Sequence, residues 1–255
     1  MYKPFDLTGR CAVVTGGNGG IGYGMASALL AAGASVAIWG SNEKKTRDAR
    51  DRLAADGGRV ECFVCDVGEE AQVERAFADS VAALGKVDAC FANAGVSSRH
   101  TPLLQMSYEE FRRVQRVNVD GVFFTFRAAA RHMADRGEGG ALVATASTAA
   151  IEGAARNSHY GASKGAVTSY VRALAVELAR YKIRVNSILP GWIVTDMTAR
   201  ATSDEKFIAA VLPRIPARRW GGIDDFGGIA VYLASDASGY HTGEQFVIDG
   251  GYTKF

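Results

Sequence analysis

The segment Thr15-Gly16-Gly17-Asn18-Gly19-Gly20-Ile21-Gly22 joins an apolar run to a stretch with helical periodicity. The apolar run, Cys11–Thr15, is typical of a buried strand, and residues 21–32 are typical of a buried helix. Glycine at such a turn lets backbone N–H groups approach a pyrophosphate, and the helix N-terminus adds partial positive charge. Tight strand-to-helix turns also use glycine for structural reasons alone, so this turn needs support from the rest of the chain.

Outside this segment, short apolar runs alternate with longer helical patterns. This alternation predicts an α/β fold: a doubly wound Rossmann domain with a parallel seven-stranded sheet and helices on both faces. The strand candidates are Cys11–Thr15, Ser35–Trp39, Val60–Val64, Val87–Ala92, Ala141–Ala146, Ile183–Leu189 and Phe246–Ile248. The helix candidates are residues 21–32, 43–56, 69–84, 107–136, 158–181 and 224–235. We expect a single domain over residues 1–255, with a small lid near 197–216, where the alternation breaks.

The amino-acid composition limits the kinds of molecule that the protein can bind. The chain has 255 residues, of which 48% are hydrophobic, and 29 basic residues against 27 acidic ones give a net charge of +2. This balance argues against disorder, nucleic-acid binding and binding to an anionic membrane. Residues 11–42 carry no charge, but their glycines leave too short an apolar helix to span a bilayer.

The N-terminal residues indicate in which cellular compartment the protein works, and the cysteines indicate whether it binds a metal. Residues 1–10 include three charged side chains and lack the apolar stretch of a signal peptide, which predicts a cytoplasmic protein. Four cysteines are too few for a disulfide framework. Cys62 and Cys65 form a C-x-x-C pattern, but in a strand they point to opposite faces, so we expect no metal.

The spacing T-G-x-x-x-G-x-G resembles that of the short-chain dehydrogenase/reductase family. Further motifs resemble the family in the same order along the chain, from about residue 7 to residue 252. Ala92 departs from the family pattern, which usually has Asn there. The resemblance implies a Rossmann fold and binding of NAD or NADP. The cofactor-binding residues that it implies are Gly16, Asn18, Gly20, Ile21, Gly22, Ser41, Asn42, Asp66, Val67, Asn93, Ala94, Gly95, Tyr160, Lys164, Pro190, Gly191, Ile193 and Thr195.

Tyr160 and Lys164 are four residues apart, so on a helix they share a face. A phenol with an ordinary pKa of ~10 is a poor acid–base catalyst at neutral pH, and a nearby ammonium favours the phenolate. Ser147 follows the fifth strand and can hydrogen-bond the same substrate oxygen. Taken alone, the pair is an ordinary amphipathic one. The resemblance adds Asn118, which in the family holds a water that links Lys164 to solvent, and it implies a catalytic set of Asn118, Ser147, Tyr160 and Lys164.

These residues predict reversible oxidation of a secondary alcohol to a ketone, with Tyr160 as general acid and base. We expect substrate contacts from Ser147, Ala149, Tyr160 and Trp192. A mainly apolar ketone of small to medium size fits these residues best, and a polar ketone is the alternative. Two alternatives remain. One is a 3-oxoacyl thioester reductase of fatty acid synthesis, against which Val176 stands where a basic residue would meet the carrier protein. The other is a non-catalytic nucleotide-binding scaffold.

The end of the second strand bears on the choice of cofactor. NAD-preferring members of the family carry Asp at the position of Gly40, and NADP-preferring members usually carry Arg at that of Ser41. Neither is present, but Lys44 or Lys45 can supply a point charge to a phosphate. We expect NADP to be preferred, with measurable use of NAD.

Two helical stretches, 107–136 and 158–181, have apolar residues on more than one face, which predicts a homotetramer. Phe123, Phe124 and Phe126 fit a core or a subunit interface. The run Arg112, Arg113 and Arg116 fits a solvated helix face, and the four histidines fit exposed or structural positions.

Overall fold

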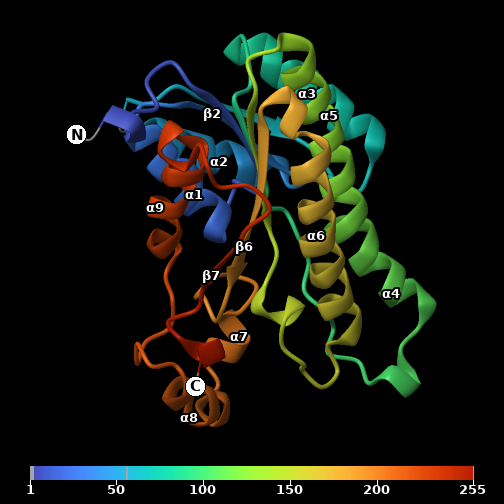
Figure 1. Cartoon of the computed structure of the whole chain (residues 1–255). Helices are drawn as coiled ribbons and strands as arrows, with labels where there is room; N and C mark the ends of the chain where they lie inside the picture. Colours follow the sequence, from blue (N-terminus) through green and yellow to red (C-terminus); the bar gives the residue numbers. More distant parts are fainter. Residues whose placement is uncertain (1–2, 56, 255) are drawn as a thin grey trace.

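The computed structural model describes residues 3–55 and 57–254 (Figure 1). In these residues seven strands form one parallel sheet, as the sequence predicted, and their order is β3-β2-β1-β4-β5-β6-β7. The strands are β1 (Cys11–Thr15), β2 (Ser35–Gly40), β3 (Val60–Val64), β4 (Ala89–Ala92), β5 (Gly140–Thr145), β6 (Ile183–Pro190) and β7 (Gln245–Ile248). The helices are α1 (Gly20–Ala31), α2 (Glu43–Ala54), α3 (Glu70–Leu84), α4 (Tyr108–Gln115), α5 (Gly121–Arg136), α6 (Ser158–Glu177), α7 (Ala199–Thr202), α8 (Glu205–Val211) and α9 (Gly227–Ala234).

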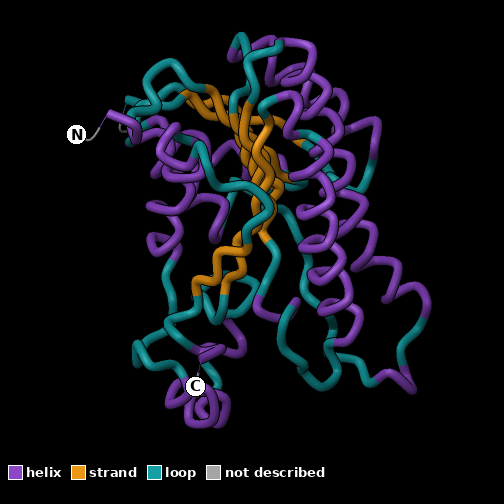
Figure 2. Tube along the Cα trace, viewed as in Figure 1, coloured by secondary structure: helices purple, strands orange, loops and turns teal. Residues whose placement is uncertain are grey.

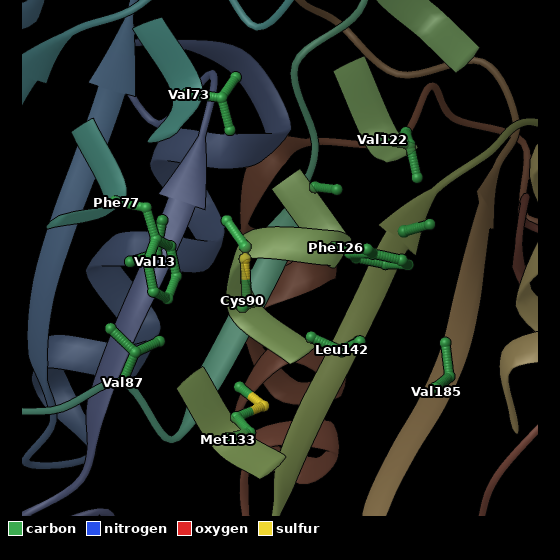
Figure 3. Packing of buried hydrophobic residues seen from close by; sticks show 14 of the residues in the cluster. Val13, Val73, Phe77, Val87, Cys90, Val122, Phe126, Met133, Leu142 and Val185 are labelled. Atoms are coloured by element: carbon green, nitrogen blue, oxygen red, sulfur yellow. The ribbon is translucent and has the colours of Figure 1, made fainter. Parts of the chain in front are cut away.

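The sheet is covered on both faces, which accounts for its apolar strands. Helices α1, α2 and α9 pack on one face, and α3, α5 and α6 pack on the other, so the strands lie between two helical layers (Figures 1 and 2). All five residues of β1 are buried. On the second face, Val13 and Leu142 of the sheet meet Phe77 of α3 and Phe126 and Met133 of α5 (Figure 3). Alternate residues of each buried strand therefore belong to different cores.

Helix ends follow local signals in the sequence. The Asn42 side chain accepts a hydrogen bond from the Lys45 N–H and caps α2, and Ser107 caps α4 in the same way. Gly85 and Gly137 end α3 and α5 with φ values of 89° and 73°, in the left-handed region that favours glycine.

One expected helix is interrupted. Instead of a continuous helix over 107–136, α4 and α5 are joined by a π-helical turn, Arg116–Asp120. The expected helix over 158–181 also ends early, because α6 stops at Glu177 and a 3₁₀ turn follows. The expected end of α2 at residue 56 lies outside the described residues, as do residues 1, 2 and 255 of the expected domain.

The region expected to form a lid holds α7, α8 and a 3₁₀ turn, and it lies beyond β6 and β7 (Figure 1). A small apolar cluster stabilises it, in which the ring of Phe207 meets Trp192 at 4.7 Å and Trp220 at 6.2 Å. Within the described part of the chain, no helix is both long and apolar enough to cross a membrane.

Candidate active site

A groove of about 510 Å³ runs along the carboxyl ends of the strands. It lies where the strand order reverses, since β1 has β2 on one side and β4 on the other. Doubly wound sheets bind their ligands at this point. All the residues expected to bind the cofactor line the groove except Gly22 and Asn42.

The glycine loop forms one wall of the groove and has no room for side chains. Gly16 has φ 65°, and a Cβ there would lie 3.0 Å from the Cα of Ala94. A Cβ at Gly22 would lie 2.4 Å from both the Asn93 Nδ2 and the Gly16 carbonyl oxygen. Gly22 therefore acts through close packing behind the loop. Gly20, the first residue of α1, lines the groove, so the positive end of the helix dipole is available to a pyrophosphate.

Side-chain hydrogen bonds join the strand ends beneath this loop. The Thr15 Oγ1 accepts from the N–H groups of Asn93 at 3.0 Å and Ala94 at 2.9 Å. The Asn93 Nδ2 donates to the Thr15 carbonyl at 3.0 Å, and the Asn93 Oδ1 accepts from Thr145 at 3.1 Å. The ends of β1, β4 and β5 are thereby fixed against one another.

At the other end of the groove, the structure brings together Ser147, Tyr160 and Lys164. Tyr160 and Lys164 lie on one face of α6, with the Lys164 Nζ 5.7 Å from the centre of the Tyr160 ring. Ser147 lines the groove beside Tyr160, and its Oγ accepts from the Ala149 N–H at 3.1 Å. Lys164 is 4% exposed and donates to the Thr145 carbonyl at 2.8 Å. The three side chains that were expected to act together therefore lie close to one another.

Burial shifts the pKa values of both Tyr160 and Lys164. It raises the pKa of Tyr160 above 10, although the hydrogen bond to Ser147 acts in the opposite direction. It also lowers the pKa of Lys164 to about 8. The expectation that the pKa of Tyr160 is lowered towards neutrality is wrong for this state of the protein, because the loss of water around the phenol outweighs the contacts that favour the phenolate.

Asn118 lies outside the groove, fully buried in the π-helical turn. Its Oδ1 accepts from the Val96 N–H at 2.8 Å, and its Nδ2 donates to the Val96 carbonyl and to the Ser163 hydroxyl, both at 3.1 Å. A Cβ on Gly95 would lie 3.2 Å from the Asn118 Oδ1 and 3.5 Å from the Lys164 Nζ. Asn118 thus fixes the loop after β4 directly behind the reacting groups.

Two arginines assigned to a solvated face have structural partners, and that prediction is wrong for them. Arg116 donates to Asp66 at 2.9 Å and to Glu69 at 2.7 Å, and it lines the groove. Arg113 donates to Glu110 at 2.8 Å and to the Ser97 carbonyl at 2.8 Å. Their partners lie on other elements or on the next turn, where a pattern of adjacent charges gives no signal.

Glu110 connects the loop after β4 to α6, the helix that carries Tyr160 and Lys164. It accepts from the Arg99 N–H at 3.1 Å and lies 3.3 Å from the Nε2 of buried His159, the neighbour of Tyr160. Hydrogen bonds from Arg113 lower the pKa of Glu110 to about 2, so it stays charged in this buried position. His159 is accordingly structural, as expected.

The residues after β2 divide between two roles. Ser41 lines the groove, whereas Asn42 caps α2 and borders a neighbouring hollow. Lys44 pairs with Asp48 on its own helix at 2.7 Å. Lys45 lines the groove and reaches across it to Asp196 at 2.6 Å. Asp196 carries no signal in the sequence, because 151 residues separate the two partners.

The expected substrate residues are also divided. Ser147 and Tyr160 line the groove, but Ala149 and Trp192 are not among the described residues that do. Trp192 packs instead in the apolar cluster of the lid region. Met197 and Thr198, at the start of the lid region, border the groove.

Comparisons with known proteins agree with this geometry. A family model described as enoyl-(acyl carrier protein) reductase matches residues 16–253. The crystal structure of a short-chain type dehydrogenase/reductase from Mycobacterium marinum is 41% identical, with a TM-score of 0.94 and 98% of each chain covered. A gluconate 5-dehydrogenase from Burkholderia cenocepacia J2315, solved with NADP and tartrate, is 35% identical, with a TM-score of 0.94 and coverage of 99% of this chain and 98% of that one. A 3-oxoacyl-[acyl-carrier-protein] reductase from Chlamydia pneumoniae is 34% identical, over 97% of this chain and 98% of that protein.

The fold, the groove and these similarities define an NAD(P)-dependent oxidoreductase that interconverts alcohols and ketones. The chain belongs to the short-chain dehydrogenase/reductase family. Its own groove fits the cofactor, since the glycine loop leaves backbone open to a pyrophosphate and the reacting side chains lie at the far end.

Proposed function

We propose that this chain reduces a small-molecule ketone with NADPH, and oxidises the corresponding secondary alcohol with NADP, with Tyr160 as general acid and base. The observation that carries the proposal is that Ser147, Tyr160 and Lys164 line the same groove, with the Lys164 Nζ 5.7 Å from the centre of the Tyr160 ring. The intact catalytic set argues against a scaffold that only binds nucleotide.

In the reduction, the bound nicotinamide supplies a hydride to the carbonyl carbon. The Tyr160 hydroxyl donates its proton to the oxygen that becomes the alcohol, and Ser147 donates a hydrogen bond to the same oxygen as charge develops on it. Lys164 stabilises the phenolate that remains on Tyr160. Asn118 hydrogen-bonds the backbone of Val96 and so holds the loop after β4 in position beside these groups.

The residues proposed to hold the cofactor follow the groove from one end to the other. Asn18, Gly20 and Ile21 are placed at the pyrophosphate, Asp66 and Val67 at the adenine, and Ile193 and Thr195 at the nicotinamide. NADP is preferred in this proposal because no carboxylate stands at Gly40. The Asn18 side chain fills that space instead, since a Cβ on Gly40 would lie 2.1 Å from its Nδ2.

The substrate is proposed to be a free small molecule. Val176 is 82% exposed at the position where a carrier-protein reductase would present a basic side chain, and Arg131 pairs with Glu74 of α3 at 3.6 Å. Burial raises the pKa of partly buried Glu152, which adds a polar group three residues after Ala149, one of the residues expected to contact the substrate. The similarity to gluconate dehydrogenases makes polyhydroxy acids a class to test beside apolar ketones.

A panel followed at 340 nm tests the proposal. Ketones of increasing polarity and an acetoacetyl thioester are offered with NADPH, and gluconate is offered with NADP. Turnover of a free ketone or of gluconate with little turnover of the thioester is the expected result. A kcat/KM highest for the thioester would favour the 3-oxoacyl reductase, and cofactor binding without turnover of any member would favour the scaffold.

Two further properties belong to the proposal. A homotetramer is supported by apolar side chains on the outer faces of α5 and α6, including Phe123, which is 39% exposed. A cytoplasmic location is supported by free cysteines at residues 11, 62, 65 and 90, which fit a reducing compartment.

A further inference from the structure

An ion pair spans the mouth of the cofactor groove. Lys45 belongs to the first turn of α2, just after β2, whereas Asp196 follows β6 on the opposite wall. The Lys45 Nζ lies 2.6 Å from the Asp196 Oδ2, and both residues line the groove. The carboxylate side chain is 86% exposed and that of the lysine 45%.

Asp196 is held in place by its neighbours. The Thr195 N–H donates to the Thr198 Oγ1 at 3.0 Å, and the Thr198 N–H donates to the Thr195 carbonyl at 3.1 Å. These bonds close a turn around Asp196, so its carboxylate faces Lys45 without a long flexible connection.

The other cations of the groove are committed elsewhere. Arg116 is bound by Asp66 and Glu69, and Lys164 is buried on the Thr145 carbonyl at the catalytic end. Among the described residues that line the groove, Lys45 is thus the cation nearest the end of β2. Glycine at position 19 leaves room for it, since a Cβ there would lie 3.1 Å from the Lys45 Nζ.

We infer that Lys45 binds the 2′-phosphate of NADP and that Asp196 is the competing partner that holds this lysine when no nucleotide is bound. The inference rests on the proposed function, because the groove must take NADP. An exposed carboxylate–ammonium pair in water is weak. A phosphate monoester carries between one and two negative charges and three acceptor oxygens, so it displaces the carboxylate. NAD, which has a hydroxyl at that position, leaves the pair intact.

Nucleotide titrations followed by calorimetry test this exchange without any turnover. The set is wild type, Asp196→Ala, Lys45→Met and the double variant, each titrated with NADP and with NAD. Lys45→Met keeps the apolar stem of the side chain and removes its charge. Arg47→Met is the matched control, because Arg47 lies on the same helix and pairs with Glu43 at 2.6 Å outside the groove.

Asp196→Ala is expected to tighten NADP binding about 2- to 5-fold relative to NAD, since the lysine no longer has to leave its partner. Lys45→Met is expected to weaken NADP about 10-fold or more and to leave NAD within about 2-fold. In the double variant the effect of removing Asp196 on the NADP-to-NAD ratio disappears, because its partner is gone. Arg47→Met leaves the ratio unchanged.

Other outcomes overturn the inference. Equal losses for NADP and NAD in Lys45→Met would place the lysine on the pyrophosphate. An unchanged ratio in Asp196→Ala would remove Asp196 as a competitor. Titrations with adenosine 2′,5′-bisphosphate and with 5′-AMP distinguish failure of this inference from failure of the proposed function. If wild type binds the bisphosphate and Lys45→Met binds it equally well, only the inference is wrong, whereas a wild type that binds neither NADP nor NAD contradicts the proposed function itself.

Discussion

Burial raises the pKa of Tyr160, so its phenol stays protonated at neutral pH. A protonated phenol is the form required to donate to a forming alkoxide. Tyr160→Phe keeps the ring and removes only this proton, and we expect a fall in kcat of about 10² to 10⁴. Stopped-flow measurement of the hydride step gives the number, and unchanged calorimetric affinity for NADP shows that the groove is intact. Retention of more than about a tenth of the wild-type kcat would exclude Tyr160 as the acid.

Lys164 contributes a pH dependence of stability that follows from its burial. Its pKa is about 8 in the folded chain and returns to about 10.5 on unfolding. Between these values the unfolded chain holds a proton that the folded chain has released, so stability rises with pH across this window. Below pH 8 both states are protonated, and the folded state bears the full cost of the buried charge, roughly 3 kcal/mol.

The measurement is the free energy of unfolding from pH 7 to 10.5 in wild type and in Lys164→Met. The variant has no such titration, so its stability relative to wild type is expected to fall by roughly 3 kcal/mol over this range. Lys206→Met, on the exposed surface of α8, corrects for the loss of one positive charge. Parallel curves for wild type and Lys164→Met would show that Lys164 does not titrate in this window.

The side chains that lie close to Gly40 determine which substitutions at this position can change the cofactor preference. An Asp there would add a carboxylate that accepts bonds from ribose hydroxyls and repels a 2′-phosphate. Gly40→Asp alone meets the Asn18 side chain, and its Cβ would also lie 2.4 Å from the Thr46 Oγ1. We expect Asn18→Gly/Thr46→Ala/Gly40→Asp, which removes both obstacles, to raise the ratio of kcat/KM for NADH over NADPH by at least 10-fold, and Asn18→Gly/Thr46→Ala is the control. An unchanged ratio in the triple variant would show that position 40 does not face the ribose.

The sequence predicted the site where its signal is local and missed it where partners are distant. Tyr160 and Lys164 could be predicted because helical spacing places them on one face. The pair Lys45–Asp196 could not be predicted, since the two residues meet only through the way α2 and the turn after β6 pack in three dimensions. Burial of the Tyr160 phenol also depends on tertiary packing, which is why the net shift of its pKa was predicted with the wrong sign.

At the scale of elements, the parallel strands were predictable because both of their faces are buried and their runs are apolar throughout. The π-helical turn between α4 and α5 was not. Periodicity continues across it, and the polar contacts of Asn118 with Val96 and Ser163 come from two other elements. A π-helical turn inside a helix often marks a functional position.

Asn118→Ala tests what this turn does. It leaves the N–H and carbonyl of Val96 without partners in a partly buried setting, at a cost of about 0.5–1.5 kcal/mol for each hydrogen bond lost. We expect lower stability in denaturant titration and faster amide exchange at residues 94–97. Ser163→Ala removes only one of the three hydrogen bonds and serves as the control. Unchanged exchange in Asn118→Ala would mean that the loop is fixed by other contacts.

At the scale of the whole molecule, the two faces of the sheet are covered, but the outer surfaces of α5 and α6 each expose a large apolar side chain. Phe123 contacts Tyr170 with ring centres 6.4 Å apart, and Val176 is 82% exposed on the same layer. Both helices lie on the face opposite α1 and α9 (Figure 1). Exposed apolar groups that gather on neighbouring helices are typical of a subunit interface.

We therefore expect light scattering at micromolar concentration to give four times the 27.0 kDa of one chain. Phe123→Glu/Val176→Glu places two charges on this layer, and burying them in an interface without partners is costly, so the variant should dissociate to smaller species. Val64→Lys, at the exposed residue of the edge strand β3, changes an apolar surface group away from α5 and α6 and should leave the mass unchanged. A wild-type mass of one chain would exclude the tetramer. A tetramer that survives the double substitution would place its interfaces on other elements.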